Sequence, residues 1–276
     1  MRRGIGAMLV VFLLSAMPLS FVGSAVVSVA PVVAGASPLA MVHSGPFAGA
    51  VNSTNWAGYA VTGATGSVSY ANASWIQPKV TCPKTGTIYL DAFWVGIDGY
   101  RSGTVEQTGT LAECLSGVSY YYAWYEFYPS ALTLYSSPTV TPGDTFQASV
   151  TYGNSTVGFL LSLTDVTTAT IATVTGTVSS AARTSAEWIA EAPSSSSGLY
   201  PLGNFGTVHF GTDATGQGAT NEATIGGVTH AIGKFAHSSI HRINMITNSG
   251  TKFKAITSVL TPDGTSFNVT WKRPGP

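Results

Sequence analysis

Residues 91–98 read DAFWVGID, and the character of their side chains alternates along the chain. Successive side chains of a β-strand point to opposite faces. Three large apolar side chains therefore share one face, which is expected to lie in a core. The opposite face combines Trp94 with Asp98. The stretch predicts a strand with one buried face and one face suited to binding.

Similar runs, rich in Val, Ile, Thr and aromatic residues, fill the rest of the chain, with Gly, Pro, Asn and Ser between them. No long stretch shows the 3.6-residue period of a helix. The predicted fold class is all-β, an antiparallel β-sandwich of two packed sheets in jelly-roll or concanavalin-like style, with residues 52–276 as a single domain. The predicted strands are 67–80, 87–97, 120–128, 145–152, 157–163, 168–178, 185–190, 206–210, 222–225, 240–246, 253–260 and 267–271.

Charged residues are scarce, with 12 basic and 12 acidic side chains among 276 residues. They make up 9% of the chain, against roughly a quarter in an average soluble domain. The balanced net charge gives no electrostatic reason to expect nucleic acid or an anionic membrane as a partner. Few carboxylates also means few native ion pairs to lose on protonation, so the composition permits an acidic environment.

The N-terminus has the pattern of an export signal. Arg2 and Arg3 precede an apolar run that is too short for a membrane span of roughly 20 residues, and small residues offer cleavage after Ala25 or Ala36. We expect residues 1–36 to be a signal peptide and residues 37–51 a short propeptide or linker. The expected location is extracellular, in an acidic environment, without membrane attachment after cleavage. A single N-terminal membrane anchor is the alternative.

The chain contains two cysteines, Cys82 and Cys114. In an exported protein, an even pair predicts a disulfide. No C-x-x-C motif is present, so neither a thioredoxin-like site nor a zinc ribbon is supported.

The segment 122–128 repeats the combination of an aromatic residue and a carboxylate on one strand face, through Trp124 and Glu126. Aromatic side chains beside a few polar groups are typical of a binding groove on a curved sheet. The alternative is a solvated outer face on which Trp and Tyr are incidental.

Several well-known catalytic motifs are absent from the sequence. It contains no G-x-S-x-G elbow, no H-E-x-x-H motif and no D-[TS]-G motif. His237 and His241 are four residues apart, but in a β-rich segment this spacing does not bring the rings together, and we interpret both as surface or satisfied core residues. No metal and no cofactor are expected. The candidates that remain are carboxylates near aromatic residues.

The order and spacing of four motifs resemble the glutamic peptidases (eqolisins), a family of secreted acid endopeptidases. The motifs are WVGIDG at 94–99, QTG at 107–109, AWYEFYP at 123–129 and AEWIAE at 186–191, with further matches in NWAGY at 55–59 and NFG at 204–206. The resemblance spans about residues 52 to 275 and implies a two-sheet β-sandwich, a protein or peptide substrate, and insensitivity to pepstatin. We expect a monomer.

The resemblance also implies a catalytic pair of one Gln and one Glu, which it places at Gln107 and Glu191, the second carboxylate of its motif. Glu191 would take a proton from water and return it to the leaving nitrogen, and Gln107 would stabilise the oxyanion. Taken alone, Gln107 in a Thr- and Gly-rich segment predicts a solvated loop residue. Strand parity does not distinguish Glu191 from Glu187, because both share a face if the strand has no bulge.

Four further residues match family positions that shape the groove and support the pair: Trp94, Asp98, Trp124 and Glu126. The sequence departs from the family pattern at Leu111, where an acidic residue is expected four positions after the catalytic Gln. Either Glu113 substitutes for it or the supporting network is thinner, which bears on the pH optimum.

Two other classes of function use the same groove. A jelly-roll glycoside hydrolase could use Glu126 and Glu191 as acid and nucleophile, which requires carboxyl groups about 5–5.5 Å apart. A carbohydrate-binding β-sandwich would need the aromatic residues but no catalytic pair.

Overall fold

The computed structural model describes residues 41–42 and 50–275, and in this part of the chain almost all regular structure is β-strand. The predicted signal peptide and most of the predicted propeptide lie outside the described residues. No described helix is long and apolar enough to cross a membrane. The described helices are α1 (Thr212–Thr215), η1 (Ile232–Lys234) and η2 (His237–Ser239).

The first sheet carries the aromatic and carboxylate residues singled out from the sequence. Its strands follow one another in the order β8 (Thr133–Leu134), β7 (Val118–Tyr128), β6 (Val105–Leu115), β5 (Tyr89–Ile97), β12 (Ser185–Glu191), β3 (Trp56–Thr62) and β18 (Ile240–Ile246). All these pairs are antiparallel, whereas the short β2 (Val51–Ser53) runs parallel to β18 and pairs with β1 (Met41–Val42).

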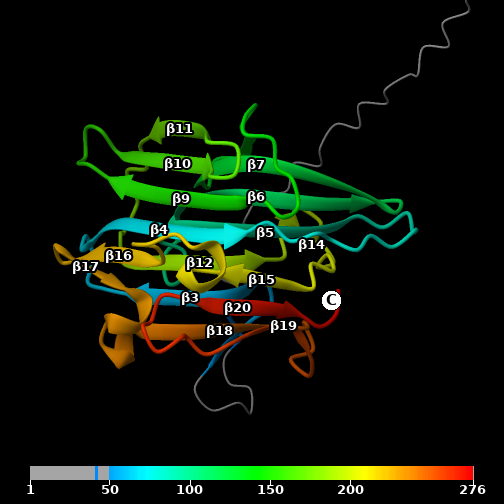
Figure 1. The fold of residues 1–276 in the computed structure, drawn as a ribbon. Coiled ribbons are helices and arrows are strands. Elements are labelled where there is room, and N and C mark those ends of the chain that lie inside the picture. The colour runs from blue at the N-terminus through cyan, green and yellow to red at the C-terminus, as the bar shows by residue number, and fades with distance from the viewer. Residues whose placement is uncertain (1–40, 43–49, 276) are drawn as a thin grey trace, which may run out of the picture. The chain divides into compact units, whose positions relative to one another are not determined.

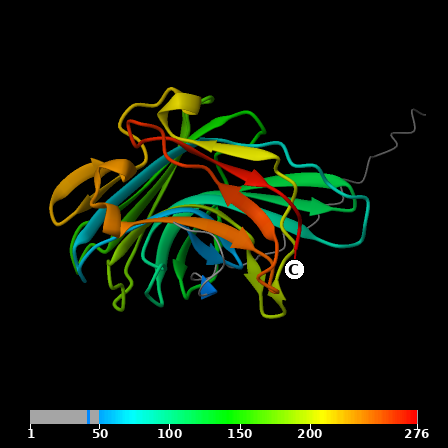
Figure 2. The same cartoon turned by 90° about the horizontal axis from the view of Figure 1, so that it is seen from below.

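The second sheet packs against the first and is connected to it by continuous pairing (Figure 1). Its strands are β11 (Thr170–Gly176), β10 (Phe159–Asp165), β9 (Thr145–Tyr152), β4 (Val68–Ile76), β16 (Glu222–Ile225), β17 (Val228–Ala231), β15 (Thr207–Phe210), β20 (Phe267–Trp271) and β19 (Phe253–Thr257). Figure 2 shows β20 beside β19, which pairs with β18 of the first sheet. A separate hairpin consists of β13 (Ser194–Ser195) and β14 (Gly198–Leu199). The predicted antiparallel β-sandwich is confirmed.

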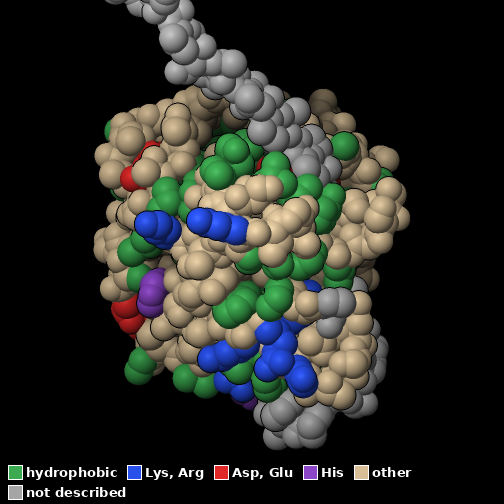
Figure 3. All heavy atoms as spheres, turned by 90° about the vertical axis from the view of Figure 1, so that its right-hand side faces the viewer, with side chains coloured by type: hydrophobic (Ala, Val, Ile, Leu, Met, Phe, Trp, Pro, Cys, Tyr) green, Lys and Arg blue, Asp and Glu red, His purple; other side chains and the backbone are tan. Residues whose placement is uncertain are grey.

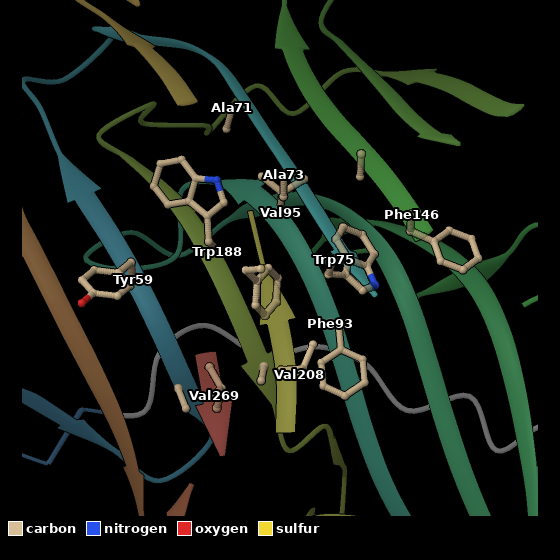
Figure 4. Packing of buried hydrophobic residues seen from close by; sticks show 14 of the residues in the cluster. Tyr59, Ala71, Ala73, Trp75, Phe93, Val95, Phe146, Trp188, Val208 and Val269 are labelled. Atoms are coloured by element: carbon tan, nitrogen blue, oxygen red, sulfur yellow. The ribbon is translucent and has the colours of Figure 1, made fainter. Parts of the chain in front are cut away.

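The main core lies between the two sheets and is rich in aromatic residues (Figure 4). Phe93 on β5 and Trp188 on β12 face Trp75 on β4, and all three are fully buried. The Trp75 indole nitrogen donates a hydrogen bond of 3.0 Å to the Thr110 hydroxyl. The apolar face predicted for residues 91–98 is therefore the core face.

The disulfide between Cys82 and Cys114 is present, as predicted, with the two Cα atoms 5.2 Å apart. It joins the segment after β4 to the end of β6. By constraining the unfolded chain, a cross-link over a loop of this length contributes about 4 kcal/mol to stability.

The largest error in the predicted strands concerns 105–115. This segment is the long strand β6, buried along nearly its whole length, and not a solvated turn. Its sequence contains Gly109 and several polar residues, which lower β-propensity. It is a strand because β5 and β7 pair with it on both sides. The strand β3 is absent from the set predicted by residue pattern, but it contains most of the NWAGY match at 55–59.

Candidate active site

Four residues on adjacent strands form a polar row on the outer face of the first sheet. Glu187 on β12 is the Cα partner of Gly96 on β5, Gly96 is the partner of Gln107 on β6, and Gln107 is the partner of Glu126 on β7. Directly opposed residues in an antiparallel pair point to the same face. We call these four residues the active-site row. Neighbouring strands lie about 4.8 Å apart, so Glu187 and Gln107 are separated by about 10 Å at their Cα atoms.

Gln107 is fully buried, and its side chain is oriented by Glu126. Its Nε2 donates a hydrogen bond of 2.8 Å to Glu126 Oε2, while its Oε1 is buried without a hydrogen-bond partner. An amide nitrogen carries two hydrogens. With one of them donated to Glu126, the second can serve an acceptor bound in the groove.

Glu187 is also fully buried, and neither of its carboxyl oxygens has a hydrogen-bond partner of good geometry among the described residues. Burial raises its pKa well above the ordinary value of 4.5, opposed by the Ser185 hydroxyl and the Tyr100 backbone amide. The negative charge of Asp98 raises this pKa further. An unpartnered buried carboxyl costs stability, so it is a candidate for function.

Two glycines allow neighbouring groups to approach closely around this pair. A Cβ on Gly96 would lie 2.9 Å from the six-membered ring of Trp94 and 3.2 Å from Gln107 Cβ. A Cβ on Gly109 would collide with the Phe93 carbonyl oxygen. The ring of Trp94 therefore lies over the glycine that separates Glu187 from Gln107.

Glu191 lies two rows away from Gln107. Its Cα partners are Ala92 and Trp56, and its Oε2 accepts a hydrogen bond of 2.8 Å from the Trp94 indole nitrogen. Four residues along a strand span about 13 Å. Glu187 and Glu191 do share a face, but only Glu187 lies in the row of Gln107.

The aromatic residues of this face form a second apolar cluster, separate from the core between the sheets. Trp56, Trp94 and Trp124 are fully buried in it. The rings of Trp56 and Trp94 meet edge to face, with centroids 4.9 Å apart. The predicted groove residues Trp94, Trp124 and Glu126 thus lie on one face.

Asp98 lies at the end of β5, with a φ of 73°, rather than in the row itself. Its carboxylate accepts hydrogen bonds from the backbone amides of Arg183 and Thr184, at 2.6 and 2.9 Å, and from the Thr184 hydroxyl at 3.0 Å. These residues immediately precede β12. Asp98 therefore fixes the entry of the strand that carries Glu187.

Buried carboxyl groups are a general feature of this protein. The buried members are Asp91, Asp98, Glu106, Glu113, Glu126, Asp165, Glu187 and Glu191, which are eight of the 12 acidic residues. Figure 3 shows a face on which basic side chains are more prominent than acidic ones. The exposed surface therefore has few carboxylates to lose their charge in acid.

Neither a metal site nor the two cavities beside the segment 258–266 compete with the active-site row among the described residues. Within residues 50–275, no group of three or more His, Cys, Asp or Glu side chains could hold a metal ion. Cavities of about 450 and 420 Å³ open on the two sides of the segment 258–266, and neither is lined by Glu187 or Gln107. The active-site row joins the predicted site residues Gln107 and Glu126, and the hydrogen bond from Trp94 to Glu191 joins a second predicted pair.

Comparisons with known proteins agree with this fold and these motifs. The sequence pattern of the Peptidase A4 family matches residues 54–271. Aspergillopepsin-2 from Aspergillus niger is 34% identical over 147 residues, which cover 50% of this chain and 51% of that protein, so the match spans about half the length of the curated relative.

Solved structures of glutamic peptidases have a similar fold. Scytalido-glutamic peptidase with a transition state analog inhibitor superimposes with a TM-score of 0.63 at 25% identity, over 79% of this chain and 98% of that one. Aspergilloglutamic peptidase from Aspergillus niger superimposes with a TM-score of 0.55 at 29% identity, over 67% of this chain and 99% of that one.

Proposed function

Because the chain belongs to the Peptidase A4 family, we propose that it is an endopeptidase that hydrolyses protein substrates with Gln107 and Glu187 as its catalytic pair. The observation that carries this proposal is the active-site row, in which an oriented amide and an unpartnered buried carboxyl flank one glycine. The mechanism needs no cofactor, because the protein's own side chains supply both the base and the hydrogen-bond donor.

In the proposed reaction, the ionised Glu187 takes a proton from a water molecule as the water oxygen attacks the peptide carbonyl carbon. The carbonyl oxygen becomes an oxyanion and accepts the second hydrogen of Gln107 Nε2, whose first hydrogen is held by Glu126. Glu187 then returns the proton to the amide nitrogen, the carbon–nitrogen bond breaks, and a carboxylic acid and an amine are released.

The assignment of the base to Glu187 differs from the assignment to Glu191 that follows from the motif alone. Glu191 accepts the Trp94 indole hydrogen at 2.8 Å and lies about 13 Å along the strand from Glu187. We assign to Glu191 the role of a positioning residue, which holds the ring of Trp94 over Gly96. The identity of the base stays a prediction, and separate substitutions of Glu187 and Glu191 distinguish the two candidates.

The alternative of a retaining glycosidase is disfavoured by the register. Glu126 and Glu191 lie three strands apart and two rows apart. Three strand spacings alone are about 14 Å, well above the 5–5.5 Å that such a mechanism needs.

Hydrolysis of an unfolded protein between about pH 2 and pH 7, with pepstatin present, tests the proposed activity. We expect cleavage by the wild-type protein and its loss in Gln107→Ala. Cleavage at an unchanged rate in that variant would overturn the Gln/Glu mechanism. Cleavage of a β-glycan but not of protein would favour the glycosidase.

We also propose that the protein is exported as a monomer and that its N-terminal segment is removed. The disulfide supports export, because such bonds persist in oxidising compartments. N-terminal sequencing and light scattering of protein from the culture medium test this. We expect a monomer without residues 1–25 or 1–36, and full-length protein retained in the cells would contradict the proposal.

A further inference from the structure

Three side chains are stacked at one end of the active-site row. The rings of Tyr100 and His241 lie nearly parallel, with an interplanar angle of 20° and centroids 4.6 Å apart. The guanidinium carbon of Arg101 lies 5.4 Å from the centroid of the Tyr100 ring. None of these residues belongs to the proposed catalytic pair.

The strand register places this stack beside Glu187. His241 on β18 is the Cα partner of Ala60, and Ala60 is the partner of Glu187. The His241 side chain therefore shares the face of the row, two strand spacings or about 10 Å from Glu187. The line of Cα partners therefore begins with His241 and Ala60 and continues through the four residues of the active-site row, Glu187, Gly96, Gln107 and Glu126.

Tyr100 connects the stack to the groove. It is 3% exposed and belongs to the apolar cluster of Trp56 and Trp94. Its hydroxyl has a raised pKa because of burial, an effect that Arg101 opposes and the charge of Glu187 reinforces. Tyr100 thus contacts an exposed cation, and its hydroxyl is influenced by the charge of the buried Glu187.

The charge at this end of the row is positive. The Arg101 side chain is exposed and carries a positive charge. His241 is half-buried, and its Nε2 lies 3.2 Å from the Thr62 hydroxyl. In acid, the charges on a peptide substrate come mainly from Lys, Arg and His, because Asp and Glu become neutral. The fixed positive charge of Arg101, at this end of the row, therefore discriminates between substrates with basic and with neutral side chains.

We propose that Arg101, Tyr100 and His241 form a substrate subsite that disfavours a basic side chain at one position near the scissile bond. The inference rests on the proposed peptidase function and names a specificity determinant for it. Like charges placed together across an interface reduce affinity, and the stacked rings hold the cation in place. The subsite accepts neutral and acidic side chains.

Peptides that differ at a single position test the proposal. Lys, Gln or Glu is placed in turn at each of three positions on either side of the cleaved bond, and kcat/KM is measured for the wild type, Arg101→Gln and Arg101→Glu. For the wild type we expect one position at which Gln is preferred to Lys by about 5-fold, as for a contact of about 1 kcal/mol. Arg101→Gln reduces this ratio, and Arg101→Glu inverts it. Lys252→Glu, the same charge change at an exposed residue beyond the far end of β18, leaves the ratio unchanged.

The two hypotheses fail in different ways. A substrate profile of Arg101→Glu that matches the wild type at every position, in a protein whose activity still depends on Gln107, would overturn the subsite and leave the peptidase proposal intact. A wild-type protein that cleaves none of the peptides and no unfolded protein would overturn both.

Discussion

Glu187 and Gln107 are both Cα partners of Gly96, one from each side, so their side chains flank a residue without a side chain of its own. Both are fully buried. Because Gly96 has no side chain, the ring of Trp94 lies over it, between an amide donor and a carboxyl base. This relationship across β5 is the basis of the proposed chemistry.

Gly109 allows close packing of the strands beside this pair. A Cβ there would collide with the Phe93 carbonyl oxygen and lie 2.7 Å from Trp94 Cβ. Since backbone has to move, we expect Gly109→Ala to lower the free energy of unfolding by about 2–3 kcal/mol, as overpacking does. Urea unfolding measures this. Gly86→Ala is the control, because a Cβ at Gly86 meets nothing within 4 Å. Equal free energies of unfolding for the two variants would contradict the close packing of Gly109 against Phe93 and Trp94.

Glu126 tests the orientation of the Gln107 amide. In Glu126→Gln the acceptor at 2.8 Å from Gln107 Nε2 can be replaced by an amide that donates, so the Gln107 side chain loses its fixed direction. We expect kcat to fall by about 10- to 100-fold, as for a displaced catalytic group, with a smaller change in KM. Steady-state kinetics on a peptide substrate measure both constants. Glu222→Gln, on the second sheet, serves as control, and equal kcat values for the two variants would rule out the positioning role.

The pH dependence of activity reports the ionisation of Glu187. Because burial raises its pKa well above 4.5, and because the base must be ionised, kcat/KM should rise with pH through a midpoint above that of an ordinary Glu. The pH profile of kcat/KM for the wild type measures this midpoint. The control Asp213→Asn, at an exposed carboxylate, leaves it unchanged. A midpoint below 4.5 would argue against Glu187 as the base.

Glu106 predicts how stability changes with pH. Burial, together with the charge of Asp98, raises its pKa to about 9. Above pH 4.5, the ordinary pKa of Glu, the unfolded chain releases a proton that the folded state still holds. The contribution of Glu106 to the free energy of unfolding is therefore complete below that pH and is lost as pH rises toward 9. Between pH 4.5 and pH 7 the loss amounts to about 3 kcal/mol.

Urea unfolding of the wild type and Glu106→Gln at these two pH values measures the contribution. We expect the wild type to lose about 3 kcal/mol more than the variant between them, because Gln does not titrate. Parallel losses in the two proteins would show that Glu106 is not held protonated.

Strand parity was sufficient to predict much of the fold. The alternation in residues 91–98 correctly separates Phe93, in the core, from Trp94, in the groove cluster. The pairing of Cys82 with Cys114 followed from there being only two cysteines. These features depend on local pattern or on counting, and so they are visible in the sequence.

The sequence alone does not show which of Glu187 and Glu191 lies in the row of Gln107. Both lie on one face of β12, and only the register between β12, β5 and β6 distinguishes them. Register depends on the packing of strands that are distant in sequence. Taken alone, the Thr and Gly content around Gln107 predicts a loop, but the segment is the strand β6 because β5 and β7 pair with it on both sides.

The stack of Tyr100 on His241 was missed for a related reason. The sequence predicts a surface or core residue at His241, because its spacing from His237 in a β-rich segment does not bring the two rings together. Its partners come from β3 and from the turn after β5, which the fold brings together. The sequence does contain one relevant signal. Alternation along residues 240–246 places His241 and Arg242 on opposite faces of the strand, so that only one of them can face the groove.

The central claim is tested most directly by comparing Glu187→Gln with Glu191→Gln under identical conditions. Hydrolysis of an unfolded protein is followed by the release of amines, and thermal melts verify that both variants are folded. We predict that Glu187→Gln loses activity by at least about 1000-fold, as for removal of a general base, while Glu191→Gln retains measurable turnover. Full activity in Glu187→Gln, with activity abolished in Glu191→Gln, would contradict the account and assign the base to Glu191.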